Sequence, residues 1–211
     1  MTIICPTITA ENLHTYREQI ERVQGFAQHL HIDLMDGVFA PSTSIKPSQI
    51  WLPEHITCDI HVMCDNPLDT VKQLPDISIR TIIVQIERMK DVDVTALRTV
   101  VGDKGANLGV ALLADTPVSA ISSIIQLLDH VLVFSGNLGY QGGSTADLAL
   151  LSKVSEILQL KPDIEIGWDG GLNDDNLARI VRAGVSVLNV GGFIHFANSP
   201  EHAYKKLVSQ I

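Results

Sequence analysis

Two short stretches of the chain carry imidazoles and carboxylates at alternating positions. They read His31-Ile32-Asp33-Leu34-Met35-Asp36-Gly37 and Asp59-Ile60-His61-Val62-Met63. In an extended strand, alternate side chains lie on the same face. His31, Asp33 and Met35 are therefore expected on one face of the first strand. Asp59, His61 and Met63 are expected on one face of the second.

A third stretch supplies another carboxylate. Asp169 lies in Trp168-Asp169-Gly170-Gly171, at the end of a later predicted strand. An imidazole and a carboxylate from one strand, an imidazole from the next and a carboxylate from across a barrel could meet at one point. Such a mixed set of nitrogen and oxygen donors suits Zn²⁺, Fe²⁺, Mn²⁺ or Co²⁺. The residues indicate a divalent-metal site made of His31, Asp33, His61 and Asp169.

Ordinary structural roles for the same side chains stay open. A histidine on a strand is commonly a hydrogen-bonded core residue, and an aspartate at a strand end can cap the next loop. Met35 and Met63 can be core filler. The metal site is favoured because each of two strands has a histidine and a methionine on the same face. Interior ionisable groups are costly unless they are paired or bind a metal.

Glycine pairs follow three consecutive predicted strands. They are Gly142-Gly143, at the end of a loop that begins at Gly136, then Gly170-Gly171 and Gly191-Gly192. Small residues let backbone N–H groups approach an oxyanion, and phosphate often binds in barrels after the seventh and eighth strands. Any one pair can be a simple turn. The three pairs together favour a phosphate site.

The elements that would position these residues alternate regularly along the chain. The predicted strands are Ile3–Ile8, His31–Met35, Cys58–Met63, Thr81–Ile86, Leu108–Leu113, Val131–Ser135, Ile164–Trp168 and Val185–Val190. The predicted helices are Glu11–His29, Leu68–Leu74, Val92–Val101, Val118–Leu128, Ala146–Leu160, Asp175–Ala183 and Pro200–Val208. The strands recur about every 26 residues, the span of one strand, one helix and two short loops.

Parallel strands with crossover helices favour a single α/β domain over residues 1–211, a closed (β/α)8 TIM barrel. The second unit is the weakest, because Pro47 and Pro53 leave room for about one helical turn. An open doubly wound sheet is the alternative. Its first strand usually leads into a glycine-rich turn, whereas Pro6-Thr7-Ile8-Thr9 contains no glycine.

Composition narrows the class of partner. The chain has 211 residues, 45% of them hydrophobic, and 15 Lys and Arg against 24 Asp and Glu give a net charge of −9. That balance argues against nucleic-acid or anionic-membrane surfaces. No apolar run is long enough to span a bilayer, and no signal peptide is recognisable. Cys5, Cys58 and Cys64 lack metal or disulfide spacing, so we expect reduced thiols and a cytoplasmic protein.

At these residues the chain resembles the ribulose-phosphate 3-epimerase family. The run H-x-D-x-M-D-G followed by D-x-H-x-M is the most specific part of the resemblance. The matching pieces occur in order over nearly the whole chain: Cys5-Pro6-Thr7-Ile8, His31 to Gly37, Asp59 to Met63, Asn66-Pro67, Asn137-Leu138-Gly139-Tyr140, Trp168-Asp169-Gly170-Gly171 and Asn189–Phe193.

The resemblance implies a TIM barrel of the ribulose-phosphate-binding type that inverts C3 of a ketose phosphate, D-ribulose 5-phosphate to D-xylulose 5-phosphate. It implies one divalent ion, Zn²⁺ in the first place, held by His31, Asp33, His61 and Asp169. It also implies that Asp33 and Asp169 act on opposite faces of the substrate carbon. One removes the C3 proton and the other returns a proton, through an enediolate that the metal stabilises.

The resemblance also implies the substrate contacts. Thr7 stands where the family usually has a serine and keeps the hydroxyl, and Met35 and Met63 match the methionine layer beside the metal. The phosphate would be lined by Gly142, Gly143, Gly170, Gly171, Gly191 and Gly192. The implied partner is a small phosphorylated sugar, and a homo-oligomer is expected because family members commonly assemble.

The chain departs from the family pattern around the substrate. Gln85 lies in V-Q-I-E where the family usually has V-H-A-E, and Phe134 replaces the third methionine. The loop Asn137 to Gly143 replaces N-P-G-F-G-G-Q, and Gly192 replaces a serine. Two alternatives therefore stay open: an epimerase of a related ketose phosphate such as allulose 6-phosphate, and a non-catalytic sugar-phosphate-binding paralogue.

A second enzyme class shares the barrel, namely the decarboxylases and hexulose-phosphate synthases. These enzymes use a D-x-K-x-x-D run on a strand. The corresponding run here is Asp33-Leu34-Met35-Asp36, which has no lysine. The missing amine disfavours this class.

Overall fold

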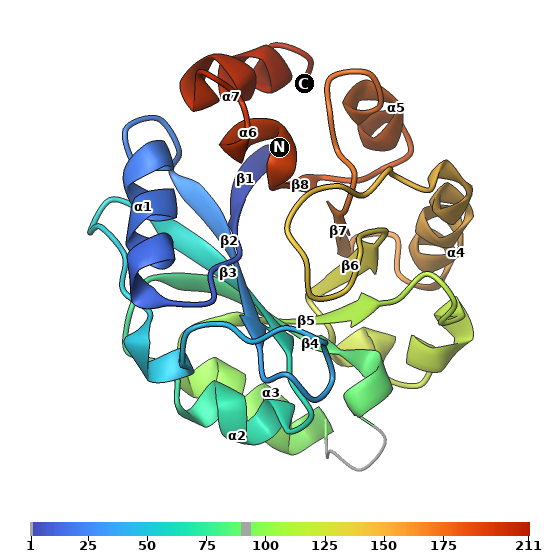
Figure 1. Cartoon of the computed structure of the whole chain (residues 1–211). Coiled ribbons are helices and arrows are strands. Elements are labelled where there is room, and N and C mark those ends of the chain that lie inside the picture. Colours follow the sequence, from blue (N-terminus) through green and yellow to red (C-terminus); the bar gives the residue numbers. More distant parts are fainter. Residues whose placement is uncertain (1, 90–93) are drawn as a thin grey trace.

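The computed structural model describes residues 2–89 and 94–211, and its centre is a closed barrel of parallel strands. The strands pair in chain order, and β8 pairs with β1 to close the ring (Figure 1). Their bounds are β1 Ile3–Ile8, β2 His29–Met35, β3 Thr57–Met63, β4 Ile79–Gln85, β5 Asn107–Leu112, β6 His130–Phe134, β7 Glu165–Asp169 and β8 Val187–Val190. The predicted α/β fold, a (β/α)8 TIM barrel, is confirmed.

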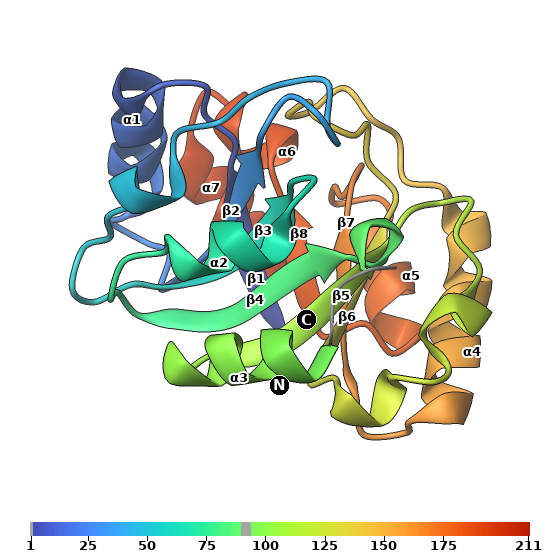
Figure 2. The same cartoon turned by 90° about the horizontal axis from the view of Figure 1, so that it is seen from below.

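Helices surround the barrel on its outer side, as the two views together show (Figures 1 and 2). They are α1 Leu13–Val23, α2 Pro67–Lys72, α3 Val94–Asp103, α4 Leu151–Leu160, α5 Leu177–Arg182, α6 Gly192–His195 and α7 Pro200–Val208. Several begin at a side-chain cap. The side chain of Asn12 accepts from Thr15 N before α1, and that of Ser199 accepts from His202 N before α7.

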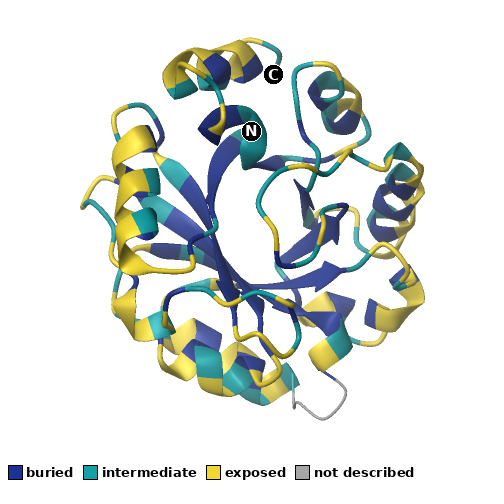
Figure 3. Cartoon of the chain, in the orientation of Figure 1, coloured by how far each residue is buried: buried dark blue, intermediate teal, exposed yellow. Residues whose placement is uncertain are grey.

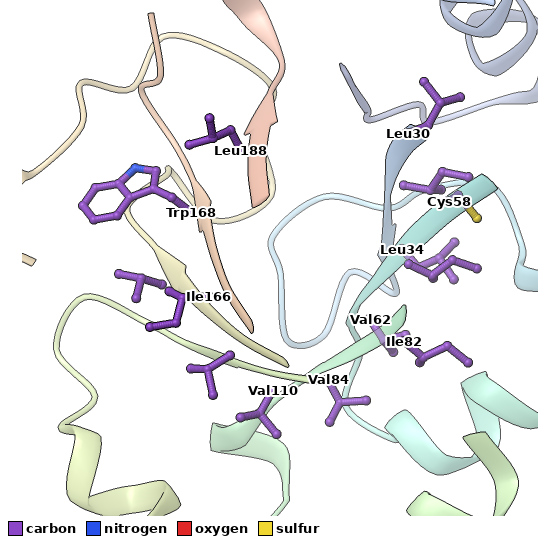
Figure 4. Packing of buried hydrophobic residues seen from close by; sticks show 14 of the residues in the cluster. Leu30, Leu34, Cys58, Val62, Ile82, Val84, Val110, Ile166, Trp168 and Leu188 are labelled. Atoms are coloured by element: carbon purple, nitrogen blue, oxygen red, sulfur yellow. The ribbon is translucent and has the colours of Figure 1, made fainter. Parts of the chain in front are cut away.

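The main apolar core lies between the strands and the helices. Alternate strand residues such as Leu34, Val62, Trp168 and Leu188 point outward from the barrel and are almost fully buried (Figure 4). The helices turn their buried faces to this layer and their exposed faces to solvent (Figure 3). The other strand residues point into the barrel. Because the main apolar core lies outside the strands, the barrel interior can contain polar side chains.

Two predicted helices differ from the structure. Glu11–His29 is too long, because α1 ends at Val23 ahead of Gly25, and His29 already belongs to β2. Val118–Leu128 forms two 3-10 turns, Val118–Ile121 and Ile125–Leu127, rather than one α-helix. The stretch contains three serines, whose side chains compete with helical backbone hydrogen bonds.

Smaller differences concern helix ends. The predicted Ala146–Leu160 helix starts later, with a 3-10 turn at Leu148–Leu150 before α4. The first two residues of the predicted Val92–Val101 helix lie outside the described residues. The weak second unit has the expected single turn, a 3-10 helix at Pro47–Gln49. The short helix α6 was not predicted.

None of the helices in residues 2–89 and 94–211 has the length and apolar composition needed to cross a bilayer.

Candidate functional site

The four predicted metal ligands meet at the carboxyl ends of three strands. β2 carries His31 and Asp33, β3 carries His61, and β7 carries Asp169 on the other side of the barrel (Figure 1). Asp33 and His61 are direct register partners, which brings their side chains to the same level. One donor atom from each of the four residues lies within 4.8 Å of all the others, and all four residues are buried.

The separations match the requirements of a small cation. Asp33 Oδ1 is 3.4 Å from both His31 Nε2 and His61 Nδ1. Asp169 Oδ2 is 3.7 Å from the first nitrogen and 4.0 Å from the second. Tetrahedral ligands at about 2.1 Å from a zinc ion lie about 3.4 Å from one another. A slight contraction would bring all four atoms to an ion among them.

The same atoms lack other partners. Among the described residues, His31 Nε2, His61 Nδ1 and Asp33 Oδ1 are buried and have no hydrogen-bond partner. Burying unpaired polar atoms is costly, so their convergence needs a further reason. Two imidazole nitrogens and two carboxylate oxygens are a suitable donor set for Zn²⁺, Fe²⁺, Mn²⁺ or Co²⁺. The residues present therefore fit a divalent metal.

Burial and mutual charge shift the proton affinities of the cluster. Burial lowers the pKa of His31, but the nearby Asp33 and Asp169 carboxylates outweigh it and raise the pKa overall. Burial acts to raise the pKa of Asp33, yet the imidazoles of His31 and His61 hold it well below its usual range. Burial raises the pKa of Asp169, and the charge of Asp33 adds to this effect. A divalent cation among the groups would favour the ionised form of both carboxylates.

Thr9 holds the second oxygen of Asp33. Its hydroxyl donates to Asp33 Oδ2 at 2.7 Å, which leaves Oδ1 facing the two histidines. Gln19 on α1 fixes the Thr9 backbone, accepting from its N–H and donating to its carbonyl, both at 3.0 Å. Sequence reasoning missed Thr9, although the alternation Thr7, Thr9 at the end of the first strand was a usable signal.

A cavity of about 250 Å³ opens beside the cluster. Its volume suits a small metabolite, since pockets for drug-sized ligands span roughly 300–1,000 Å³. Asp33 and Asp169 line it, as do all the residues predicted to contact substrate: Thr7, Met35, Met63, Gly142, Gly143, Gly170, Gly171, Gly191 and Gly192. The structure thus brings the predicted ligands and the predicted substrate contacts to one place.

Two of the glycines also have a structural role. Gly170 and Gly171 have positive φ angles of 109° and 70°. A Cβ on Gly170 would lie 2.1 Å from Gly136 N, and one on Gly171 would lie 2.0 Å from Ala146 N. The loops after β6 and β7 can meet only because these positions lack a side chain. The structure thus shows a turn at this pair, and the phosphate-lining role stays a prediction.

The two predicted methionines are part of the packing and also line the cavity. Met35 and Met63 are buried and pack with Ala40 in a small apolar cluster, and both line the cavity. Phe134, which stands in place of a third methionine, also lines the cavity. Its ring centre lies 5.7 Å from that of His61. Part of the cavity lining is therefore apolar.

Asn189 on β8 was not among the predicted site residues. It is the register partner of Asp169, is 1% exposed and lines the cavity. Neither polar atom of its carboxamide has a hydrogen-bond partner among the described residues, and the same is true of Thr7 Oγ1. The signal in the sequence was a single amide within the apolar run Val185–Val190. Two unpartnered polar groups next to a cavity point to a ligand that would pair with them.

Comparison with known proteins agrees with this arrangement. The model of the ribulose-phosphate 3 epimerase family matches residues 3–195. The chain is 31% identical over 218 residues to the ribulose-phosphate 3-epimerase of Aquifex aeolicus, covering 99% of this chain and 96% of the relative. It is 27% identical to the Bacillus subtilis enzyme of the same name, covering 100% and 98%.

Solved structures show the same fold at low sequence identity. The 3-hexulose-6-phosphate synthase from Salmonella typhimurium has a TM-score of 0.71 at 14% identity, covering 100% of this chain and 98% of that one. KGPDC from Streptococcus mutans has a TM-score of 0.76 at 12% identity, covering 100% and 97%. At this identity the likeness concerns the barrel alone.

Proposed function

The chain belongs to the ribulose-phosphate 3-epimerase family and is a carbohydrate epimerase, and from this we propose that it inverts C3 of a ketose phosphate. The proposed pair is D-ribulose 5-phosphate and D-xylulose 5-phosphate. The observation that carries the proposal is the convergence of four donor atoms within 4.8 Å beside a cavity of about 250 Å³.

His31, Asp33, His61 and Asp169 would hold one divalent ion, Zn²⁺ in the first place. When bound, the cation would polarise the C2 carbonyl and the C3 oxygen and stabilise the negative charge that develops on them. The imidazoles contribute neutral donors and the aspartates contribute anionic ones, so the four residues neutralise the ion's charge. Burial of the cluster excludes water from these groups and strengthens every interaction among them.

Asp33 and Asp169 would act as the acid and base. They come from β2 and β7 on different sides of the barrel, and both reach the cavity. A planar intermediate between them would have one carboxylate on each face. One would remove the C3 proton, and the other would deliver a proton from the opposite side, which inverts the carbon. Thr9 supports this role because its hydroxyl fixes the orientation of Asp33.

The rest of the cavity would bind the sugar phosphate. The backbone N–H groups of the glycines after β6, β7 and β8 would approach the phosphate closely, because no side chain intervenes. Thr7 and Asn189 would hydrogen-bond to sugar hydroxyls, since both have unpartnered polar atoms. Met35 and Met63 would cover the apolar side of the carbon chain.

A related ketose phosphate such as allulose 6-phosphate is a second candidate substrate. Phe134 and Gln141, two of the positions that depart from the family pattern, line the cavity. The Gln141 side chain also donates to the Thr7 carbonyl at 2.7 Å, so the altered loop contacts a residue predicted to bind substrate. Assembly of several copies stays a prediction, which sedimentation would test.

An epimerisation assay on a panel of ketose phosphates, run with and without a chelator, tests the proposal. We expect turnover of ribulose 5-phosphate that falls on chelation and returns on addition of a divalent metal. Faster turnover of allulose 6-phosphate would select the second candidate. No turnover of any ketose phosphate by metal-loaded protein would contradict the proposed reaction.

A further inference from the structure

The ring of His61 lies between the four-donor cluster and a second buried group. Its Nδ1 faces the carboxylates of Asp33 and Asp169, and its Nε2 lies 2.8 Å from the carboxamide nitrogen of Gln85. His61 and Gln85 are each 0% exposed, so water does not compete for this contact. Gln85 is one of the residues at which this chain departs from the family pattern.

A neutral imidazole carries one hydrogen, on one of its two nitrogens. If Nδ1 of His61 uses its lone pair to bind a cation, the hydrogen is on Nε2 and requires an acceptor. Gln85 is the residue at hydrogen-bond distance from that nitrogen, and its carboxamide has an oxygen acceptor as well as an N–H donor. The hydrogen bond made by the outer nitrogen of a metal-binding histidine fixes which nitrogen binds the metal.

The carboxamide presents its N–H donor to His61 and leaves Oε1 buried, without a hydrogen-bond partner within the described part of the chain. A half-turn about the terminal bond exchanges these two atoms with almost no change in shape. This orientation suits His61 with its hydrogen on Nδ1, facing Asp33. The turned orientation suits His61 with its hydrogen on Nε2, gives Oε1 a donor and moves the carboxamide N–H to the position that Oε1 held.

We propose that Gln85 is a positioning residue for the metal site: its Oε1 accepts from His61 Nε2–H and so keeps the Nδ1 lone pair directed at the cation. The inference rests on the proposed function, because it assumes a metal at the four-donor cluster. The Phe134 ring packs beside the His61 ring, with the ring centres 5.7 Å apart. His31 has no equivalent partner among the described residues, since its Nδ1 is unpaired.

Two substitutions separate an acceptor role from simple packing. Gln85→Met keeps a similar length and volume but removes the acceptor, and Gln85→Glu keeps an acceptor. We expect zinc affinity, measured by chelator competition, to fall roughly 10- to 100-fold in Gln85→Met and to stay at or above the wild-type value in Gln85→Glu. Thr81→Val is the matched control, because Thr81 is equally buried on the same strand and lies away from the cluster. It should bind zinc as the wild type does.

A measurement on the wild-type protein needs no variant to fold. In the zinc-loaded, ¹⁵N-labelled protein, long-range ¹H–¹⁵N spectra should show the His61 hydrogen on Nε2 and the zinc on Nδ1, with the signal assigned by its loss in His61→Gln. A hydrogen on Nδ1 would overturn the inference. So would equal zinc affinity in Gln85→Met and wild type, which would leave the proposed function standing. Failure of the wild type to bind any divalent metal would instead overturn the metal site itself, and the role of Gln85 with it.

Discussion

The two ends of the barrel interior both carry ionisable side chains, but only one end includes an arginine among them. At the amino ends of the strands, the lower end of the barrel, Arg80 donates from Nη1 to both carboxylate oxygens of Glu165 at 2.8 Å and from Nη2 to Asp59. His130 Nδ1 lies 2.8 Å from Glu165 Oε2. Each of these four groups therefore has a partner among the other three.

At the carboxyl ends of the strands, the upper end, the pattern is different. One nitrogen of each imidazole lies 3.4 to 4.0 Å from an oxygen of each carboxylate, and among the described residues no arginine or lysine forms an ion pair with these four groups. Within the described part of the chain, buried atoms without a hydrogen-bond partner occur at both ends, since Asp59 Oδ1 and His130 Nε2 lack one in the lower network. We infer that the lower end, which has its own cationic side chain, contributes to stability. Under the proposed function, the upper end would take up a cation from outside and would serve binding and catalysis.

The largest effect should come from the upper carboxylates. Asp169→Asn and Asp33→Asn would each remove a proposed acid/base group and a proposed anionic metal ligand. We expect kcat/KM for ketose-phosphate epimerisation to fall about 10³-fold or more, since positioned proton transfer alone contributes roughly 10²–10⁴-fold. Glu165→Gln at the lower end is the control and should keep its activity. An equal loss of kcat/KM in Glu165→Gln would show that the two ends do not differ in function.

The free energy of unfolding should depend on the lower end more than on the upper end. Arg80→Met leaves the carboxylate of Asp59, which is 1% exposed, without its cation. Removing one partner of a buried ion pair costs about 3–5 kcal/mol of unfolding free energy. Urea denaturation should show this loss, while the folded fraction keeps its kcat. A change below about 1 kcal/mol would mean that the lower network is not a stabilising element.

The alternating sequence pattern predicted the upper end well. His31, Asp33 and His61 could be placed because a strand repeats every two residues, so two neighbouring strands are enough to align them. The lower network could not be predicted in this way. Its four members come from β3, β4, β6 and β7, and a register shift between Cys58 and Asp59 alters the pairing with β4.

Contacts that depend on tertiary structure were also missed. Thr9 meets Asp33 only because β1 and β2 pair with Thr7 opposite His31. Asn189 is a single amide in an apolar strand, and only the register of β8 against β7 places it beside Asp169. The prediction of one helix over Val118–Leu128 was wrong. The spacing of apolar residues does not show that serine side chains compete for the backbone hydrogen bonds of a helix.

A substitution of Asn189 tests whether the upper end serves binding rather than stability, and because this side chain is uncharged, it does so without changing the charge of the site. Asn189→Leu removes the hydrogen bonds proposed for a sugar hydroxyl but also removes unpaired buried polar atoms. We expect KM to rise roughly tenfold, the value of about one good hydrogen bond. The free energy of unfolding should stay level or rise by about 1 kcal/mol. A clear loss of stability with unchanged KM would assign Asn189 to structure instead.

The smallest effect concerns acid stability. Burial acts to raise the pKa of Glu165, but its contacts with His130 and Arg80 lower it from 4.5 to about 2. Because the folded pKa is the lower one, this stabilisation is complete above pH 4.5 and is lost as the pH falls toward 2. The difference in Tm between wild type and Glu165→Gln should therefore shrink over this window. A constant difference would show that the lower network does not hold the carboxylate ionised.

The most direct test of the division between the two ends is solvent isotope exchange at the substrate carbon. Ribulose 5-phosphate incubated in D₂O with the metal-loaded wild-type protein should gain deuterium at C3, and a chelator should stop the gain. Ribulose 5-phosphate that binds to the metal-loaded protein without acquiring deuterium at C3 would contradict the account, because Asp33 and Asp169 would then bind without exchanging a proton.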